Sequence, residues 1–385
     1  MRRLKSFASI AGALALSLSL AACSSNQDSG AAGETAPAEV AAQEMDTSVC
    51  KGLTLNFIGI AGEEGDKELA SFRSDLEMKL QVSNNADWGQ LIGAIKVGQE
   101  FDLSTLPNAE AQRMIASGVV QEIDTSKLTN WNDVVQGLRN SSIIRNADGK
   151  VFGVPIAWGD GPIVYSTKRV PTPPTSITEL LTPAWKGRFT MFDDPALPFF
   201  MLAQSLGFTE VPLLTFDQLN QVKAKAKTLV KNASAFQTSY QDATDRMVAG
   251  DVDLTIGGWE AMTAWAEKKE VELGYSFLKE GKGGGWFDSI AIPSTAKYPE
   301  CALAYINEMI SPKTQGVVAT NLMSGATNAK AVPLISAEAN IYDYKLVESE
   351  TPGIEFVSFT PPNSVPDGYA TMDDWRKAWA QVKVG

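Results

Sequence analysis

The segment Leu53-Thr54-Leu55-Asn56-Phe57-Ile58 opens the folded part of this sequence and decides its class. It is typical of a β-strand. Apolar residues then recur every three or four positions, at Leu69, Phe72, Leu76 and Leu80 and again at Trp88, Leu91, Ile92 and Ile95. This spacing predicts two helices, and Phe101-Asp102-Leu103 begins the next strand. Alternating strands and helices predict an α/β fold with an open, mostly parallel sheet that carries helices on both sides.

The second half of the chain repeats this alternation. Residues 188–192 and 253–257 read as strands, and residues 196–206 read as a helix. A further helix has Thr215 as its cap and Gln218 three residues later, which is the spacing of a capping box. Two more helices are predicted by apolar faces at residues 303–310 and 375–382. A chain of 385 residues exceeds one domain of roughly 100–200 residues, so we expect two lobes with separate cores.

Two extended segments, residues 154–158 and 288–293, lie at the borders of this second half. They are predicted to be crossover strands, so each lobe consists of two separate parts of the chain. The first lobe is predicted to hold residues 50–157 plus 288–325, and the second lobe residues 158–287 plus 326–385. The predicted fold is therefore α/β, with two doubly wound sheets joined by hinge strands. Ligands in such sheets bind where the strands end in loops.

The start of the sequence has the pattern of an export signal. It begins with basic residues, residues 10–20 form an apolar run too short to span a bilayer, and small residues follow. Leu20-Ala21-Ala22-Cys23 resembles the bacterial lipoprotein signal, in which the cysteine becomes lipidated after cleavage. We therefore expect residues 1–22 to be removed and Cys23 to carry a lipid. An ordinary signal peptide with an incidental Cys23 is the alternative.

Residues 23–49 are rich in Ser, Ala, Gly, Glu and Pro and contain few large apolar side chains. Such a segment cannot bury enough surface to fold and is predicted to be a disordered tether. The sequence therefore predicts a protein of the cell envelope, periplasmic or otherwise outside the cytoplasm, that is anchored to a membrane through Cys23.

The composition argues against several classes of function. A formal net charge of −12 disfavours nucleic acid, which needs a basic face on its protein partner. The sequence contains no histidine, which removes the commonest general base, the commonest metal ligand and every Ser-His or Cys-His nucleophile. Dense metal-ligand spacing is absent from the sequence, so we expect neither a metal nor a cofactor.

Cys50 and Cys301 remain once Cys23 is assigned to the lipid. In an oxidising compartment these two cysteines can form a disulfide. Two unpaired thiols are the alternative, and the sequence leaves both open.

A series of short motifs resembles one family of transport proteins. In chain order the motifs are Val154-Pro155-Ile156-Ala157-Trp158-Gly159, Pro173-Pro174-Thr175-Ser176, Pro183-Ala184-Trp185-Lys186-Gly187-Arg188, Phe192-Asp193-Asp194-Pro195, Gly250-Asp251-Val252-Asp253-Leu254, Gly257-Gly258-Trp259, Lys279-Glu280-Gly281, Trp286-Phe287-Asp288-Ser289-Ile290-Ala291-Ile292-Pro293 and Asn328-Ala329-Lys330-Ala331. The ordered series resembles the spermidine/putrescine-binding proteins of bacterial ABC importers. This resemblance implies a periplasmic-binding-protein-like fold, a small amine clasped between two lobes, and no enzymatic activity. It also implies a monomer that docks on the membrane permease.

Carried over position by position, the resemblance implies ligand contacts from Asp194, Trp259, Trp286 and Asp288. The chemistry fits, because carboxylates form charge-assisted hydrogen bonds with ammonium groups and indole rings attract cations. Trp286 and Asp288 are two residues apart, so on a strand both side chains point to the same face. The alternatives are a helix cap for Asp194 and packing roles for the tryptophans.

The sequence also departs from the family at several expected ligand positions. The loop at residues 59–64 lacks the usual aromatic residue, as does the segment 107–109, and Leu197 stands where a second carboxylate is expected. The aromatic residue expected late in the pocket falls near Met323-Ser324. Glu63, Glu64, Asp160 and Glu260 could supply carboxylates in place of the missing one, but we expect these four side chains on the solvated surface.

These departures keep other ligands open, namely amino acids, choline-like amines and thiamine. A function of another class is also open. It is an exported hydrolase that uses a carboxylate pair, which does not need histidine.

Overall fold

In the computed structural model, residues 45–84 and 88–384 are described. Their first sheet has five strands in the order β2-β1-β3-β10-β4. The strands are β1 (Thr54–Gly59), β2 (Lys79–Asn84), β3 (Leu103–Pro107), β4 (Val154–Gly159) and β10 (Trp286–Ala291). Strands β1, β2 and β3 are parallel, whereas β10 runs antiparallel to both β3 and β4. The predicted α/β class is confirmed, with mixed sheets in place of mostly parallel ones.

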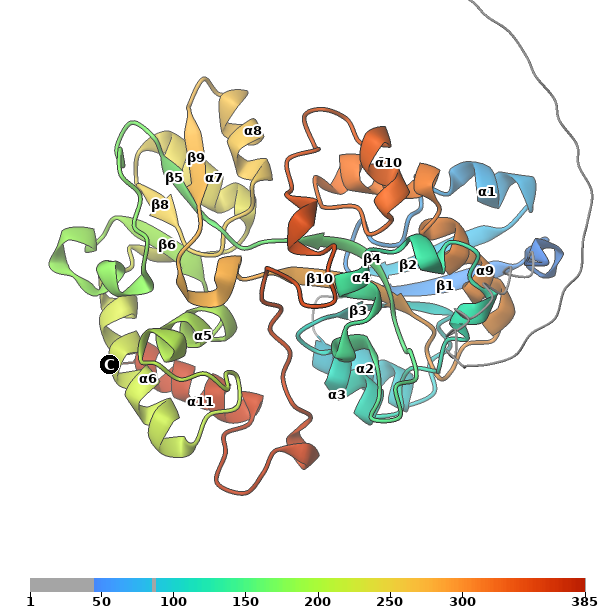
Figure 1. The fold of residues 1–385 in the computed structure, drawn as a ribbon, viewed down its shortest axis with the longest axis horizontal. Coiled ribbons are helices and arrows are strands. Elements are labelled where there is room, and N and C mark those ends of the chain that lie inside the picture. Colours follow the sequence, from blue (N-terminus) through green and yellow to red (C-terminus); the bar gives the residue numbers. More distant parts are fainter. Residues whose placement is uncertain (1–44, 85–87, 385) are drawn as a thin grey trace, which may run out of the picture. The chain divides into compact units, whose positions relative to one another are not determined.

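The helices of this first lobe follow its strands along the chain (Figure 1). They are α1 (Ala70–Asp75), α2 (Trp88–Lys96), α3 (Ala111–Ala116), α4 (Gln136–Arg139), α9 (Pro299–Met309) and α10 (Pro312–Leu322). Helices α2 and α9 were predicted, but the expectation of one helix from Leu69 to Leu80 is wrong at its end. Helix α1 ends at Asp75, and Leu80 belongs to β2, which pairs with β1 through Leu55. Backbone pairing with β1 thus overrides the helical spacing.

The second sheet also has five strands, in the order β7-β6-β8-β5-β9. They are β5 (Ile163–Ser166), β6 (Phe189–Phe192), β7 (Ala235–Gln237), β8 (Leu254–Thr255) and β9 (Leu273–Ser276). Its helices are α5 (Ala196–Ser205), α6 (Phe216–Asn232), α7 (Tyr240–Ala249), α8 (Ala261–Glu267) and α11 (Met372–Lys383). The predicted capping box of α6 is confirmed, since Thr215 Oγ1 accepts from Gln218 N and Gln218 Oε1 accepts from Thr215 N.

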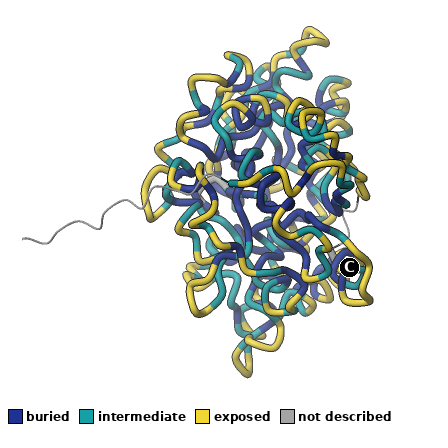
Figure 2. Tube along the Cα trace, turned by 90° about the vertical axis from the view of Figure 1, so that its right-hand side faces the viewer, coloured by how far each residue is buried: buried dark blue, intermediate teal, exposed yellow. Residues whose placement is uncertain are grey.

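Each sheet has its own hydrophobic core, and the buried stretches of chain alternate with exposed loops (Figure 2). The last part of the chain contributes to both cores. Tyr342, Val347 and Ile354 pack in the core of the first sheet, whereas Phe359 and Trp375 pack in the core of the second. The sequence prediction gave all of residues 326–385 to the second lobe. Apolar side chains at 342–354 join the first core instead.

Short 3₁₀ helices connect these elements. They are η1 (Thr47–Cys50), η2 (Thr125–Lys127), η3 (Trp131–Asp133), η4 (Ser142–Ile144), η5 (Ile177–Leu181), η6 (Pro183–Trp185), η7 (Glu280–Gly283), η8 (Ala329–Leu334), η9 (Tyr344–Leu346) and η10 (Pro362–Ser364).

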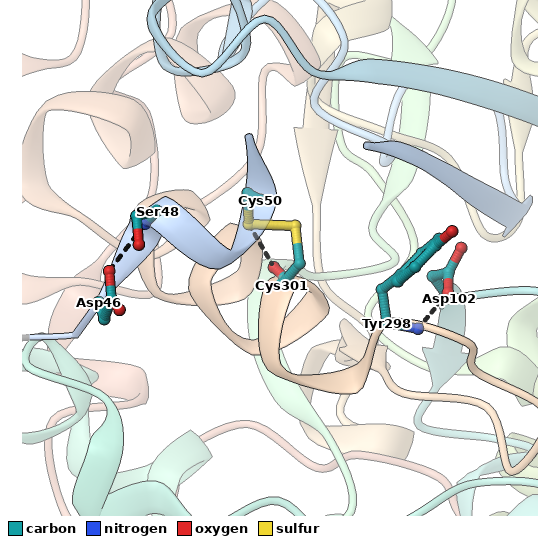
Figure 3. Close-up of a disulfide and its surroundings, with 6 residues drawn as sticks. All are labelled: Asp46, Ser48, Cys50, Asp102, Tyr298 and Cys301. Carbon is teal, nitrogen blue, oxygen red and sulfur yellow. Dashed lines mark hydrogen bonds between the residues drawn. A yellow bond between two sulfur atoms is a disulfide. The ribbon is translucent and has the colours of Figure 1, made fainter. Parts of the chain in front are cut away.

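The structure joins Cys50 at the end of η1 to Cys301 in α9 by a disulfide, and both residues are buried (Figure 3). The bridge ties the beginning of the first lobe to the part of the chain that returns to it.

The predicted leader and its lipidation site, Cys23, lie outside the described residues. In the part of the chain that the structure covers, no helix combines the length and the apolar character needed to span a membrane.

Candidate functional site

A cavity of about 280 Å³ lies at the strand ends and is lined by residues of both sheets. Asn108 and Ala109 follow β3, Trp286 begins β10, and the other wall comes from the second sheet and its loops. Five glycines line it, Gly161, Gly257, Gly258, Gly284 and Gly285. Without side chains these positions allow the backbone to approach a ligand closely.

Strand β10 holds Trp286 against the end of β4. In the β10–β4 ladder Trp286 pairs with Gly159, and a Cβ atom on Gly159 would lie 2.7 Å from Cζ2 of the indole. Only glycine therefore lets the Trp286 ring lie over this strand end. The half-buried ring forms an aromatic wall of the cavity.

Two carboxyl groups meet beside this wall, those of Glu63 and Asp288. Glu63 lies in the loop after β1 and is only 5% exposed, and Asp288 is half-buried on β10, opposite Pro107 of β3. The two side chains share a hydrogen bond, and Thr105 Oγ1 donates to Glu63 Oε2 at 2.8 Å. Desolvation raises the pKa of Asp288 to about 6, and desolvation together with the charge of Asp288 raises the pKa of Glu63.

A second pair of carboxyl groups is formed by Asp160 and Glu260, which are 4% and 2% exposed. Asp160 directly follows β4, and Glu260 follows β8 through Gly257-Gly258 and precedes α8. The two side chains share a hydrogen bond, and the Tyr342 hydroxyl donates to Glu260 Oε2 at 3.3 Å. Burial first and the neighbouring Asp160 second raise the pKa of Glu260 to about 10. Burial also raises the pKa of Asp160.

An aromatic group connects the cavity to these carboxyl groups. Tyr240 lines the cavity, and its ring centroid lies 5.0 Å from that of Phe192 and 5.5 Å from that of Trp259. Burial raises the pKa of Tyr240 to about 12, with further contributions from the negative charges of Asp288 and Glu260. The Tyr240 phenol is therefore a common neighbour of both carboxyl pairs.

Trp259 contacts the first lobe rather than the cavity. Its Nε1 donates to the carbonyl of Met323 at 3.1 Å and to the hydroxyl of Tyr342 at 3.3 Å. Met323 ends α10 with a φ of 46°, a left-handed conformation that is strained for a side-chain-bearing residue. The carbonyl held in this way accepts hydrogen bonds from both lobes.

Neither carboxyl pair has a counter-cation among the side chains that the structure describes. Among the described side chains, none of the salt bridges involves Glu63, Asp160, Glu260 or Asp288. The same described residues contain no cluster of three or more side chains suited to a metal ion. Carboxyl groups placed together without a cation must share protons, which is consistent with the raised pKa values.

The four residues expected to contact a ligand have different surroundings. Trp286 and Asp194 line the cavity, Asp288 pairs with Glu63, and Trp259 forms the contacts between the lobes. Asp194 also caps α5, because its Oδ1 accepts from the backbone N–H of Ala196 at 2.7 Å. The ligand-binding roles of these residues stay predictions.

The expectation that Glu63, Asp160 and Glu260 lie on the solvated surface is wrong, because all three are buried. For Asp160 and Glu260, the position after a strand could have indicated a place in the site. Asp160 directly follows the apolar run of β4, and Glu260 follows β8 and two glycines, where ligand-binding loops of α/β sheets occur. Burial of Glu63 depends on Thr105 and Asp288, which are distant in the sequence and gave no signal.

Two α/β lobes with a cavity at their strand ends define a two-lobe binding protein. The chain belongs to the family of bacterial extracellular solute-binding proteins, whose family model matches residues 70–344. The family membership predicted from the motif series is thereby confirmed.

Relatives within this family bind polyamines according to their names. The spermidine/putrescine-binding periplasmic protein of Escherichia coli K12 is 29% identical over 241 residues, which are 62% of this chain and 66% of the relative. The match thus covers just under two thirds of that relative's length. The putrescine-binding periplasmic protein PotF of the same strain is 26% identical over 309 residues, 74% of this chain and 79% of the relative.

Solved structures support the fold. The spermidine/putrescine ABC transporter substrate-binding protein PotD of Streptococcus pneumoniae matches with a TM-score of 0.70 at 20% identity, covering 86% of this chain and 99% of that one. The Tp0655 lipoprotein of Treponema pallidum matches with a TM-score of 0.72 at 16% identity, covering 86% and 100%.

Proposed function

We propose that this protein captures a small amine, with polyamines such as spermidine and putrescine as the first candidates, and delivers it to the permease of an ABC importer. The observation that carries this proposal is the group of carboxyl side chains beside an aromatic cavity, which have no lysine or arginine partner among the described side chains. Ammonium groups supply the missing positive charge and the hydrogen-bond donors. The names of the relatives support the same ligand class.

In this proposal Asp288 provides the principal counter-charge and Trp286 the aromatic wall. Trp286 lines the cavity two residues before Asp288 on the same strand, which supports a shared role. Trp259 takes part through its hydrogen bonds between the lobes, and Asp194 contributes charge at the cavity wall. Closure of the lobes around the amine would replace its hydration shell with these groups.

The composition of the cavity disfavours amino acids as ligands. An amino acid carries a carboxylate that needs a strong donor, but none of the described residues that line the cavity is a lysine or an arginine. Quaternary amines are disfavoured too, because they have no N–H group to satisfy the carboxyl pairs.

A thermal-shift panel tests the ligand class. The mature protein is heated with polyamines, amino acids and quaternary amines in turn, since a ligand of the folded state raises the melting temperature. We expect shifts with the polyamines alone, followed by titration calorimetry for affinity. Shifts from amino acids without any from polyamines would contradict the proposal.

The proposed role also includes a lipid anchor on Cys23, which rests on the lipoprotein-like signal. Cys23→Ser should release the protein from membranes or leave its leader uncleaved, as judged by fractionation and mass. Normal processing together with unchanged membrane association of this variant would contradict the anchor while leaving the ligand proposal intact.

A further inference from the structure

The Asp160–Glu260 pair lies at positions that the family motifs did not single out. Both side chains are more than nine-tenths buried. One carboxylate oxygen, Asp160 Oδ1, has no hydrogen-bond partner among the described residues. A buried acceptor without a donor is costly, and native structures rarely keep one without a functional reason.

A purely structural role explains the pair poorly. Packing between lobes is achieved more cheaply by apolar side chains, because burying carboxyl groups incurs a large desolvation cost. Among the side chains that the structure describes, no lysine or arginine forms a salt bridge with either acid. The Tyr342 hydroxyl bonds Glu260 rather than Asp160, and Asp160 Oδ1 has no hydrogen-bond partner among the described residues.

The pair lies next to the cavity wall. Gly161, which follows Asp160, and Gly258, two residues before Glu260, both line the cavity. Tyr240 lines it as well and is electrostatically close to both Glu260 and Asp288. A ligand that contacts the Tyr240 phenol in this cavity therefore lies near both carboxyl pairs.

We propose that Asp160 and Glu260, together with the Tyr342 hydroxyl, form a second ammonium-binding site, so that the ligand is a linear cation with at least two amines. An ammonium group has three N–H donors, which match Asp160 Oδ1, a Glu260 oxygen and the Tyr342 hydroxyl oxygen. The inference rests on the proposed function and assigns the second amine to residues of its own.

Binding at this site exchanges one cation for another. The proton shared by Asp160 and Glu260 leaves to the buffer, and the ammonium takes its place between the two carboxylates. The same exchange occurs at Glu63 and Asp288. A diamine therefore releases protons from both pairs, and a monoamine from one pair only.

Calorimetry with putrescine, spermidine and butylamine tests this site, in two buffers of different ionisation enthalpy so that released protons are counted. We expect Glu260→Gln to weaken putrescine binding about 10- to 100-fold, as for loss of a hydrogen bond to a charged group. Butylamine binding should stay unchanged, and the number of protons released with putrescine should fall. Asp160→Asn should behave in the same way.

Glu280→Gln is the matched control. Glu280 is a buried glutamate of the second lobe, but it accepts hydrogen bonds from Ser176 and from the backbone of Ile177 rather than facing another acid. This variant should bind putrescine as the parent protein does.

Other results separate failure of this site from failure of the proposed function. A folded Glu260→Gln protein that binds putrescine with full affinity and unchanged proton release would overturn the second site. Equal loss of butylamine and putrescine in this variant would also overturn it, because Glu260 would then not distinguish the second amine. If the parent protein binds none of the three amines, the proposed function itself is wrong.

Discussion

The two carboxyl pairs differ in how the fold builds them. Glu63 and Asp288 both belong to the first lobe, and Thr105 of the adjacent strand β3 fixes Glu63 by a hydrogen bond. Asp160 comes from the segment before β5, the first strand of the second sheet along the chain, and Glu260 from the segment after β8, the fourth. The hydroxyl that bonds Glu260 belongs to Tyr342, which packs in the core of the first lobe.

One lobe therefore assembles the Glu63–Asp288 pair, whereas the contacts of the Asp160–Glu260 pair depend on both lobes. The loop after β1, Thr105 of β3 and the register of β10 between β3 and β4 bring Glu63 and Asp288 together within the first lobe. The contacts of Glu260 and Trp259 with Tyr342 and Met323 form only when the lobes are in contact. We infer that the first pair is the preformed part of the site and the second pair responds to closure.

The largest expected effect comes from the preformed pair. Asp288→Asn keeps the shape of the side chain but removes its charge, so it should weaken amine binding by about 2–5 kcal/mol, as when one partner of a buried charge pair is lost. Titration calorimetry with the ligand found in the thermal-shift panel measures this loss.

Asp251→Asn provides the matched control for this substitution, since Asp251 is an exposed aspartate in the loop after α7. It should leave affinity unchanged. Full affinity in Asp288→Asn would exclude Asp288 from the site and remove the basis for calling its pair the preformed one.

Removal of the disulfide tests how much this bridge stabilises the lobe that holds the Glu63–Asp288 pair. Replacing Cys50 and Cys301 by alanine removes a crosslink between residues 251 positions apart and should lower the free energy of unfolding by about 2–5 kcal/mol. Urea denaturation of oxidised protein and of the double variant measures this difference. Mass spectrometry that finds two free thiols in the exported parent protein would contradict the crosslink.

A smaller effect is expected at the aromatic wall. Trp286→Ala should weaken binding by about 1–3 kcal/mol, because it removes stacking area and cation–π attraction but leaves the charge of Asp288 in place. Trp286→Phe should recover part of the affinity, which calorimetry can resolve. Equal affinity of the alanine variant and the parent protein would show that the ligand does not contact this wall.

The sequence predicted the sheets that carry this site better than it predicted where the acidic side chains of the site lie. The alternation after Leu53 and the extended segments at 154–158 and 288–293 predicted two sheets, and β4 and β10 indeed lie side by side. These features are local, since apolar spacing and β-branched runs act over a few residues. Motif resemblance supplied Trp286 and Asp288, which the structure then placed next to Gly159 and Glu63.

The buried acids were missed because their burial is not a local property. A glutamate in the loop after β1 is expected in solvent, and only Thr105 and Asp288 make the interior position of Glu63 tolerable. Tyr342 lies 82 positions from Glu260 and bonds it through the packing of the lobes. Helix α10 was missed for a related reason, since its buried residues include Thr314, Gln315 and Gly316, which carry little apolar signal.

The smallest expected effect is a difference between the two carboxyl pairs in how the stability of the protein depends on pH. Both Asp288 and Glu260 have pKa values raised above 3.8 and 4.5, to about 6 and about 10. A carboxyl group with a raised pKa binds more protons in the folded than in the unfolded protein, so stability is greatest below its unfolded pKa and falls as pH rises. The ligand-free protein should therefore melt at a lower temperature with each step from pH 4 upward.

Asp288→Asn should flatten this decline between about pH 4 and pH 6, and Glu260→Gln should flatten it from about pH 4.5 to about pH 10, because each amide removes one titrating group. Thermal unfolding of ligand-free protein across this pH range checks both slopes, and the amine should restore stability most strongly at high pH, where it replaces the lost protons. If Glu260→Gln leaves the slope above about pH 6 unchanged, or Asp288→Asn flattens that slope as well, the two pairs titrate as one coupled cluster, and the distinction between a preformed pair and a closure-dependent pair fails.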